Sequence, residues 1–261
     1  MAAASARLPV RVARKIREAQ DICSLELVPA GGDPLPHFAA GSHIDVHLPD
    51  GITRQYSLCN PAGVEDRYQV CVLRDPNSRG GSAAVHDQLA QGDLLEISEP
   101  KNHFSLAHGA PFSVLIAGGI GITPLICMAE RLHHTGAKFQ MHYCAKSSDR
   151  TAFRDRIAAS AYRSQVEFHF SATSGRADMS ELLRGAERAA HVYVCGPQKF
   201  IDAVLSAARS LGWPEDRLHR EYFASNVTLG KGDSFDVKLA SSGQVVPIQP
   251  DETVLAALHK A

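Results

Sequence analysis

The chain has 261 residues, enough for two domains that each bury a hydrophobic core. Hydrophobic residues make up 44% and charged residues 21%, an ordinary composition for a soluble globular protein. The 27 basic and 28 acidic residues leave a formal net charge of -1, which argues against nucleic acid as a partner, and no apolar run is long enough to cross a membrane.

The N-terminus and the cysteines indicate the compartment. Residues Met1–Pro9 lack the apolar stretch of a secretory signal. The six cysteines are scattered, with neither a C-x-x-C pair nor a His-Cys cluster at metal-ligand spacing. We therefore expect a cytoplasmic protein with reduced cysteines and no metal site in this chain.

From Leu8 to about Pro100 the sequence predicts short strands separated by Gly/Pro/Asn/Asp turns, with one helical piece at Ser82–Gln91. The expected strands are Pro9–Ala19, Ile22–Pro29, Ser42–Leu48, Thr53–Leu58, Tyr68–Val72 and Asp93–Ser98. This spacing favours an antiparallel barrel or sandwich.

From Ala110 the pattern changes to strands that alternate with helices, which is typical of a parallel sheet covered on both faces. The expected strands are Phe112–Ala117, Lys138–Ala145, Glu167–Ala172 and His191–Val194. The expected helices are Pro124–Thr135, Ala152–Ser160, Met179–Arg188 and Gln198–Leu211.

The C-terminal part contains less structure of its own. Arg217–Ser225 is expected to be extended and Asn226–Asp233 to be a linker. A hairpin of Phe235–Leu239 and Gln244–Ile248 then precedes a helix at Glu252–Lys260. Because a hairpin and one helix bury too little to fold alone, this tail is either part of a further domain or packs on the rest of the chain.

A glycine cluster follows the most apolar strand, Val114–Ala117. Gly118, Gly119 and Gly121 precede Thr123 and Pro124, which suit the cap and first turn of a helix. Such a turn can hold a pyrophosphate through backbone N–H groups and the helix dipole. The spacing is not G-x-G-x-x-G, and the same glycines are also compatible with close packing alone.

Three more motifs contain residues suited to a cofactor. In Arg54-Gln55-Tyr56-Ser57-Leu58-Cys59-Asn60, an arginine and an aromatic share one strand face and a serine lies on the other. Arg74 through Arg79-Gly80-Gly81-Ser82 places cations, glycines and a hydroxyl at a helix start, as a phosphate monoester requires. Cys195-Gly196-Pro197 ends the last expected parallel strand. Taken singly, these motifs also fit an exposed strand, a solvated turn and a plain helix start.

Together and in this order, R-x-Y-S-L-C-N, R-G-G-S, A-G-G-I-G-I-T-P and C-G-P resemble the ferredoxin–NADP reductase-like flavoprotein reductases of Rieske oxygenase systems, in the branch of phthalate dioxygenase reductase and vanillate demethylase reductase. The resemblance implies a six-stranded antiparallel flavin-binding barrel over residues 1–105, a parallel-sheet NAD-binding domain over 106–226, and a partial ferredoxin-like (β-grasp) tail over 227–261. The fold class is thus β plus α/β.

The resemblance also implies site residues. Ser57 and Cys195 would take part in hydride transfer. FMN would be held by Arg54, Gln55, Tyr56, Ser57, Val72, Arg74, Arg79, Gly80, Gly81 and Ser82, with Phe223 covering the ring. NADH would be held by Gly118, Gly119, Gly121, Thr123, Pro124, Lys146, Cys195, Gly196 and Pro197.

The expected activity is transfer of a hydride from NADH to FMN, followed by single-electron transfer through a 2Fe-2S cluster to a Rieske-type oxygenase. The family's C-x4-C-x2-C ligands are absent from this chain, so the cluster is expected only in a longer form. Three alternatives stay open: an FAD-containing ferredoxin reductase, a non-catalytic flavoprotein electron-transfer subunit, and a Rossmann-like enzyme without flavin.

Overall fold

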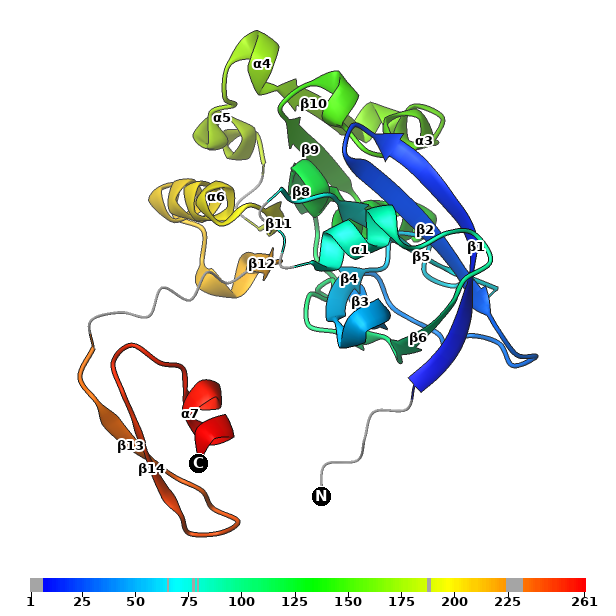
Figure 1. The fold of residues 1–261 in the computed structure, drawn as a ribbon. Helices are drawn as coiled ribbons and strands as arrows, with labels where there is room; N and C mark the ends of the chain where they lie inside the picture. The colour runs from blue at the N-terminus through cyan, green and yellow to red at the C-terminus, as the bar shows by residue number, and fades with distance from the viewer. Residues whose placement is uncertain (1–6, 65, 77, 79, 187–188, 224–231) are drawn as a thin grey trace. The chain divides into compact units, whose positions relative to one another are not determined.

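The computed structural model describes residues 7–64, 66–76, 78, 80–186, 189–223 and 232–261 (Figure 1). The chain forms two compact units, Met1–Phe223 and Ala224–Ala261. The first unit contains two sheets, and its division into two domains near residue 105 stays a proposal.

The first sheet is antiparallel and, among the described residues, contains the six expected strands plus one short additional strand. The six run in the order β4-β3-β6-β1-β2-β5, and β7 pairs with β3. A bridge between Leu58 and Val70 links the two ends of this order. The strands are β1 (Arg7–Ala19), β2 (Ile22–Pro29), β3 (Ser42–His47), β4 (Thr53–Ser57), β5 (Tyr68–Leu73), β6 (Leu94–Ser98) and β7 (Lys101–Asn102). The expected antiparallel barrel is confirmed.

Alternation of side chains explains why these strands close around a core. On β1, Val10 and Val12 are fully buried while Arg11 between them is exposed. They meet buried residues of β2, β3 and β6 in one cluster. Helix α1 (Gly81–Asp87) covers one end of the barrel with Ala84 and Val85.

The second sheet is parallel, in the order β10-β9-β8-β11-β12. Its strands are β8 (Ser113–Gly118), β9 (Phe139–Ala145), β10 (Val166–Phe170), β11 (His191–Gly196) and β12 (Leu218–Tyr222). Its helices are α2 (Ile122–His134), α3 (Arg154–Ala158), α4 (Ser171–Ser174), α5 (Met179–Arg184) and α6 (Gln198–Ser210). The segment expected only to be extended near Arg217 therefore contributes a fifth strand. The end of the strand expected at Glu167–Ala172 is instead the short helix α4.

Strand β8 is buried on both faces, as its apolar run predicts. Leu115 and Ala117 pack into one core, and Val114 and Ile116 pack into another on the opposite face. The first of these cores also contains Ile22 of β2, so the barrel and the parallel sheet share apolar side chains.

The second unit contains the expected hairpin and helix: β13 (Phe235–Lys238), β14 (Val245–Ile248) and α7 (Val254–Lys260). The Thr253 hydroxyl accepts a hydrogen bond from the Ala256 N–H and caps α7. Val246, Ile248 and Ala257 form a small buried cluster. None of the helices in the described ranges combines the length and the apolar composition that a bilayer crossing requires.

Candidate functional site

Strand β4 places an arginine against the start of α1. A Cβ built on Gly81 would lie 2.5 Å from Nε and 2.6 Å from Cγ of Arg54. Only a glycine at this position therefore lets the arginine lie across the helix start. Tyr56, two residues along the same face, is half-buried against the barrel core. Burial raises the pKa of the Tyr56 phenol to about 12, so the ring carries a neutral hydroxyl.

Three other residues predicted to bind the flavin have side chains that are bonded to other residues or buried in the core. The Gln55 amide donates to Asp45 on β3 at 2.9 Å. The Val72 side chain is 2% exposed in the barrel core, so only its backbone can face a cofactor. Arg74 Nη1 lies 2.6 Å from an oxygen of Asp87, the last residue of α1.

The loop before α1 is held by hydrogen bonds around its serines. The Ser82 hydroxyl accepts from the Asp75 N–H at 3.1 Å, and the Ser78 hydroxyl accepts from the Ser82 N–H at 3.2 Å. Gly80 precedes the helix with φ +89, a conformation that favours glycine. Arg79 lies outside the described residues.

The glycine turn after β8 approaches the loop after β11 very closely. A Cβ built on Gly121 would lie 2.2 Å from the carbonyl oxygen of Cys195, so a side chain there would push the loops apart. Gly119, by contrast, has φ +56 and would place a Cβ in open space. Close packing therefore explains Gly121, whereas Gly119 faces a side of the turn where a ligand has room.

The expected cap of helix α2 is wrong. Residues Gly119–Gly121 form a 3-10 turn that continues directly into α2, with Gly121 as the residue before the helix. The buried Thr123 hydroxyl therefore donates to the Ile120 carbonyl at 3.1 Å instead of capping the helix. Pro124 lies in the first turn of the helix, where its missing N–H costs no hydrogen bond.

The Cys195-Gly196-Pro197 loop also depends on small residues. A Cβ on Gly196 would lie 3.0 Å from the Gly118 Cα, and a Cβ on Gly118 would lie 2.7 Å from the Phe200 ring. Pro197, with extended backbone, precedes helix α6. The ends of β8 and β11 thus approach closely, and the Phe200 ring packs against Gly118 and Gly196.

Ser57 and Cys195 are brought to a common neighbour, Glu221 on β12. The Ser57 hydroxyl donates to Glu221 Oε2 at 3.1 Å, which joins the barrel to the parallel sheet. Cys195 and Glu221 are register partners on adjacent parallel strands. Burial raises the pKa of Glu221 to about 7, and the hydrogen bond from Ser57 partly opposes this. Burial and the nearby Glu221 charge raise the pKa of Cys195 well above its usual range, so the thiol is neutral.

The remaining predicted residues follow the carboxyl ends of other strands. Lys146 is exposed directly after β9, and Phe223 is 44% exposed directly after β12. Since parallel strands end at one edge of their sheet, both residues lie on the same edge as the glycine turn and the Cys195 loop.

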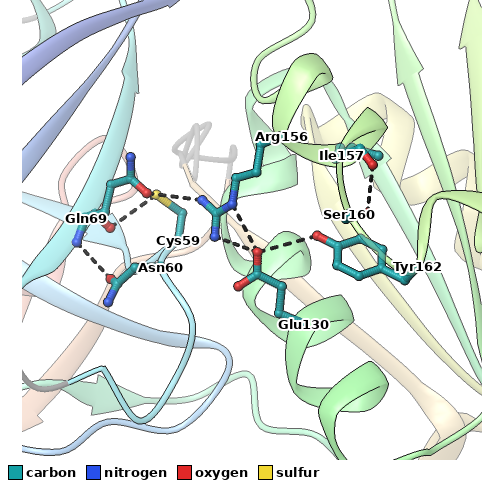
Figure 2. Close-up of polar contacts among 8 residues, drawn as sticks. All are labelled: Cys59, Asn60, Gln69, Glu130, Arg156, Ile157, Ser160 and Tyr162. Atoms are coloured by element: carbon teal, nitrogen blue, oxygen red, sulfur yellow. Dashed lines mark hydrogen bonds and ion pairs between the residues drawn. The ribbon is translucent and has the colours of Figure 1, made fainter.

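A polar network connects the barrel to helices α2 and α3 (Figure 2). Arg156 on α3 donates to Glu130 Oε1 on α2 from Nε at 3.0 Å and from Nη2 at 2.7 Å. Its Nη1 donates to the Gln69 side chain on β5 at 3.1 Å. The Arg156 and Glu130 side chains are 27% and 16% exposed. Burial raises the pKa of Glu130, and the Arg156 charge opposes that rise.

The same network reaches the end of the predicted flavin motif. The Gln69 N–H donates to the Asn60 side chain at 2.8 Å, and the Cys59 N–H donates to the Gln69 carbonyl at 2.9 Å. Cys59 and Asn60 close the motif that begins at Arg54. Helix α2 in turn begins at the glycine turn. Arg156 and Glu130 therefore fix these two motifs relative to one another.

Sequence reasoning missed Glu221 and Arg156 as parts of this site. Glu221 precedes the expected Phe223 by two residues, but its partner Ser57 lies 164 residues away in the sequence. Arg156 lies in an expected helix with no motif around it. In both cases the signal exists only in the folded chain.

Comparisons with known proteins agree with this architecture. A family model described as dimethylamine monooxygenase subunit DmmA-like, N-terminal domain, matches residues 98–218. The vanillate O-demethylase oxidoreductase of Pseudomonas putida is 49% identical over 245 residues, which cover 93% of this chain and 77% of that protein. The phthalate dioxygenase reductase of Burkholderia cepacia is 37% identical over 258 residues, covering 97% and 80%.

A solved structure of phthalate dioxygenase reductase superimposes with a TM-score of 0.80 at 36% identity, covering 97% of this chain and 80% of that one. It is described as a modular structure for electron transfer from pyridine nucleotides to a 2Fe-2S centre. The chain therefore belongs to the family of oxygenase-system reductases that includes vanillate O-demethylase oxidoreductase and phthalate dioxygenase reductase.

Proposed function

We propose that the chain is an NADH-dependent flavoprotein oxidoreductase, the reductase component of a multicomponent oxygenase. It takes a hydride from NADH onto FMN, and single electrons then pass through a 2Fe-2S domain of a longer form to a Rieske-type aromatic oxygenase or demethylase. Family membership supports a reductase of an oxygenase system. The observation that supports the redox step is the Ser57–Glu221 hydrogen bond beside Cys195. It joins the two sheets at the place where the flavin and nicotinamide rings would have to stack.

The flavin would lie along β4 and the start of α1. Arg54 offers a guanidinium to a phosphate, Gly80 and Gly81 offer backbone N–H groups, and Ser82 offers a hydroxyl. The close fit of Arg54 over Gly81 supports this placement. Arg74, which forms an ion pair with Asp87, would add a second cation beside Arg54 at this site. A single compact phosphate site favours FMN.

The nucleotide would lie over the glycine turn, with its pyrophosphate near Gly119 and the start of α2. Lys146, exposed at the same sheet edge, would contact its ribose side. A 2′-phosphate would need free cations there. Arg150 lies 3.3 Å from Asp21, and the acidic Asp149 is its neighbour, which supports NADH over NADPH.

The chain's own residues would orient the two rings and handle a proton, while the bound flavin supplies the hydride acceptor. Cys195 is a neutral, buried thiol, so its proposed role is to position the nicotinamide and not to attack it. Ser57 is fixed by Glu221 with its hydroxyl at the junction of the two sheets. Glu221 Oε2 can hold or release a proton near neutral pH, since its pKa is raised to about 7.

The 2Fe-2S part of the proposal rests on the longer relatives and on the hairpin and helix of residues 235–260. Cys195 is the last cysteine in the sequence, so this tail offers no thiolate to a cluster and we derive no electron-transfer step within it. The P. putida relative and phthalate dioxygenase reductase extend beyond the matched region, which covers 77% and 80% of their lengths.

Three measurements test the cofactor assignment. Flavin released from the purified chain is expected to be unchanged by phosphodiesterase, because FMN has no pyrophosphate. Conversion to FMN would instead identify FAD and the alternative ferredoxin reductase. With an artificial electron acceptor, kcat/KM is expected to be higher for NADH than for NADPH, and the reverse ratio would refute the nucleotide assignment. A colourless protein would exclude the flavin.

A further inference from the structure

Three potential metal ligands that belong to none of the motifs described above converge at the edge of the parallel sheet. Strands β9 and β10 are neighbours, and β10 is the edge strand (Figure 1). His142 lies on β9, and Glu167 and His169 lie two residues apart on β10. His142 is the register partner of Glu167, so all three side chains project from one face of the sheet. They are the only such group of three found among the described residues.

The distances between the ligand atoms suit a small cation. His142 Nδ1 lies 3.1 Å from His169 Nε2 and 3.5 Å from Glu167 Oε2, and His169 Nε2 lies 3.9 Å from Glu167 Oε2. A tetrahedral Zn²⁺ with ligands at about 2.0–2.1 Å keeps its ligand atoms about 3.3 Å apart. Each observed distance lies within about 0.6 Å of that value.

The alternative explanation is a hydrogen bond between the two imidazoles without a cation, and it explains only part of this arrangement. It explains the 3.1 Å contact but not the convergence of the Glu167 carboxylate on the same two nitrogens. The His142 side chain is 3% exposed, so its position is set by the surrounding core and the ligand atom is preorganised.

We propose that His142, Glu167 and His169 bind one Zn²⁺ ion through two imidazole nitrogens and a carboxylate oxygen, with water in the fourth position. Two histidines and a carboxylate are a donor set that Zn²⁺ accepts. The Glu167 side chain is 59% exposed, so the ion can enter from solvent and the fourth position is open to water. The bound ion would tie the edge strand β10 to β9 and stabilise that side of the sheet. The proposal is independent of the redox function.

The same sheet provides an internal control. His191 on β11 and His219 on the opposite edge strand β12 form a second cross-strand pair, with Nδ1 2.9 Å from Nε2. No third ligand joins this pair among the described residues. His219→Gln therefore removes an imidazole from an equivalent pair without touching the proposed site.

The test is equilibrium dialysis of the EDTA-treated full chain against Zn²⁺, together with thermal melting with and without Zn²⁺. The parent and H219Q are expected to bind one equivalent and to melt at a higher temperature with Zn²⁺. In E167Q and H169Q the affinity is expected to fall at least about tenfold, and the shift in Tm to disappear. Because Glu167 is exposed, E167Q is expected to fold like the parent. Equal Zn²⁺ binding by the parent and E167Q, or an equal loss in H219Q, would overturn the proposal.

Discussion

Replacing Arg156 with methionine tests whether the Arg156–Glu130–Gln69 network fixes the barrel against helices α2 and α3. Methionine keeps much of the apolar stem but removes all three hydrogen bonds that the guanidinium makes with Glu130 and Gln69. Glu130 then stays in the interior with only a 3.5 Å contact to the Tyr162 hydroxyl, and its Oε2 atom already lacks a partner.

The expected loss of stability follows from the burial of the pair. Removing one partner of a fully buried ion pair costs about 3–5 kcal/mol of unfolding free energy. Because the two side chains are 27% and 16% exposed, water screens part of this, and we expect about 2–3 kcal/mol for R156M. Burial already raises the pKa of Glu130 above 4.5. At low pH Glu130 takes up a proton and loses its buried charge. The loss of unfolding free energy in R156M is therefore full at about pH 8 and shrinks toward pH 4.5.

The assay is urea denaturation at several pH values, with a matched surface arginine as control. Arg209 makes a bidentate pair with Glu215, but these side chains are 49% and 61% exposed. R209M is therefore expected to lose much less unfolding free energy than R156M. Stopped-flow reduction of R156M by saturating NADH should also slow, by about tenfold, since the two motifs lose their fixed separation. Equal stability losses in R156M and R209M, or a deficit in R156M that grows at low pH, would refute the reasoning.

Three further variants address the junction itself. Ser57→Ala is expected to slow flavin reduction in stopped flow while leaving NADH affinity nearly intact; a trace equal to that of the parent would remove Ser57 from the mechanism. For Glu221→Gln, the pKa raised to about 7 means that the parent loses stability as pH rises from 4.5 through about 7. E221Q should lack that fall in Tm between about pH 5 and pH 8, and an unchanged pH profile would contradict the assignment. Gly121→Ala would place a Cβ 2.2 Å from the Cys195 carbonyl oxygen and push the two loops apart. Because the proposed flavin site lies on the barrel, flavin content should be retained while reduction by NADH is largely lost. Normal reduction kinetics would show that the two loops need not touch.

Most of the fold could be predicted because the strands that bury a face have a clear pattern. Val10 and Val12 alternate with exposed residues, and Val114–Ala117 is apolar throughout. Strand β12 (Leu218–Tyr222) was expected only to be extended. Its sequence Leu-His-Arg-Glu-Tyr is mostly polar because it forms an edge of the sheet, and only pairing with β11 makes it a strand.

The motifs predict candidate site residues, but not the contacts between motifs. Arg54 packs over Gly81 of a second motif, and Gly121 contacts Cys195 of another, while the roles of these residues stay predictions. Thr123 was wrongly expected to cap α2, because a glycine turn that continues into the helix leaves no place for a cap.

Contacts between distant strands left no signal in the sequence. Ser57 meets Glu221 across 164 residues, and His142 meets His169 only because β9 and β10 pair in one register. A shift of that register by one residue would turn His169 to the opposite face. Such contacts become visible only when the strands are placed in space.

We propose above that a flavin and a reduced nicotinamide lie face to face between the two sheets of this chain. The most direct measurement is the visible absorption spectrum of the purified chain under anaerobic conditions, before and after one equivalent of NADH. We expect a flavin spectrum that bleaches on mixing. A protein that stays yellow with excess NADH, or that has no visible absorption, would contradict this arrangement of the two rings.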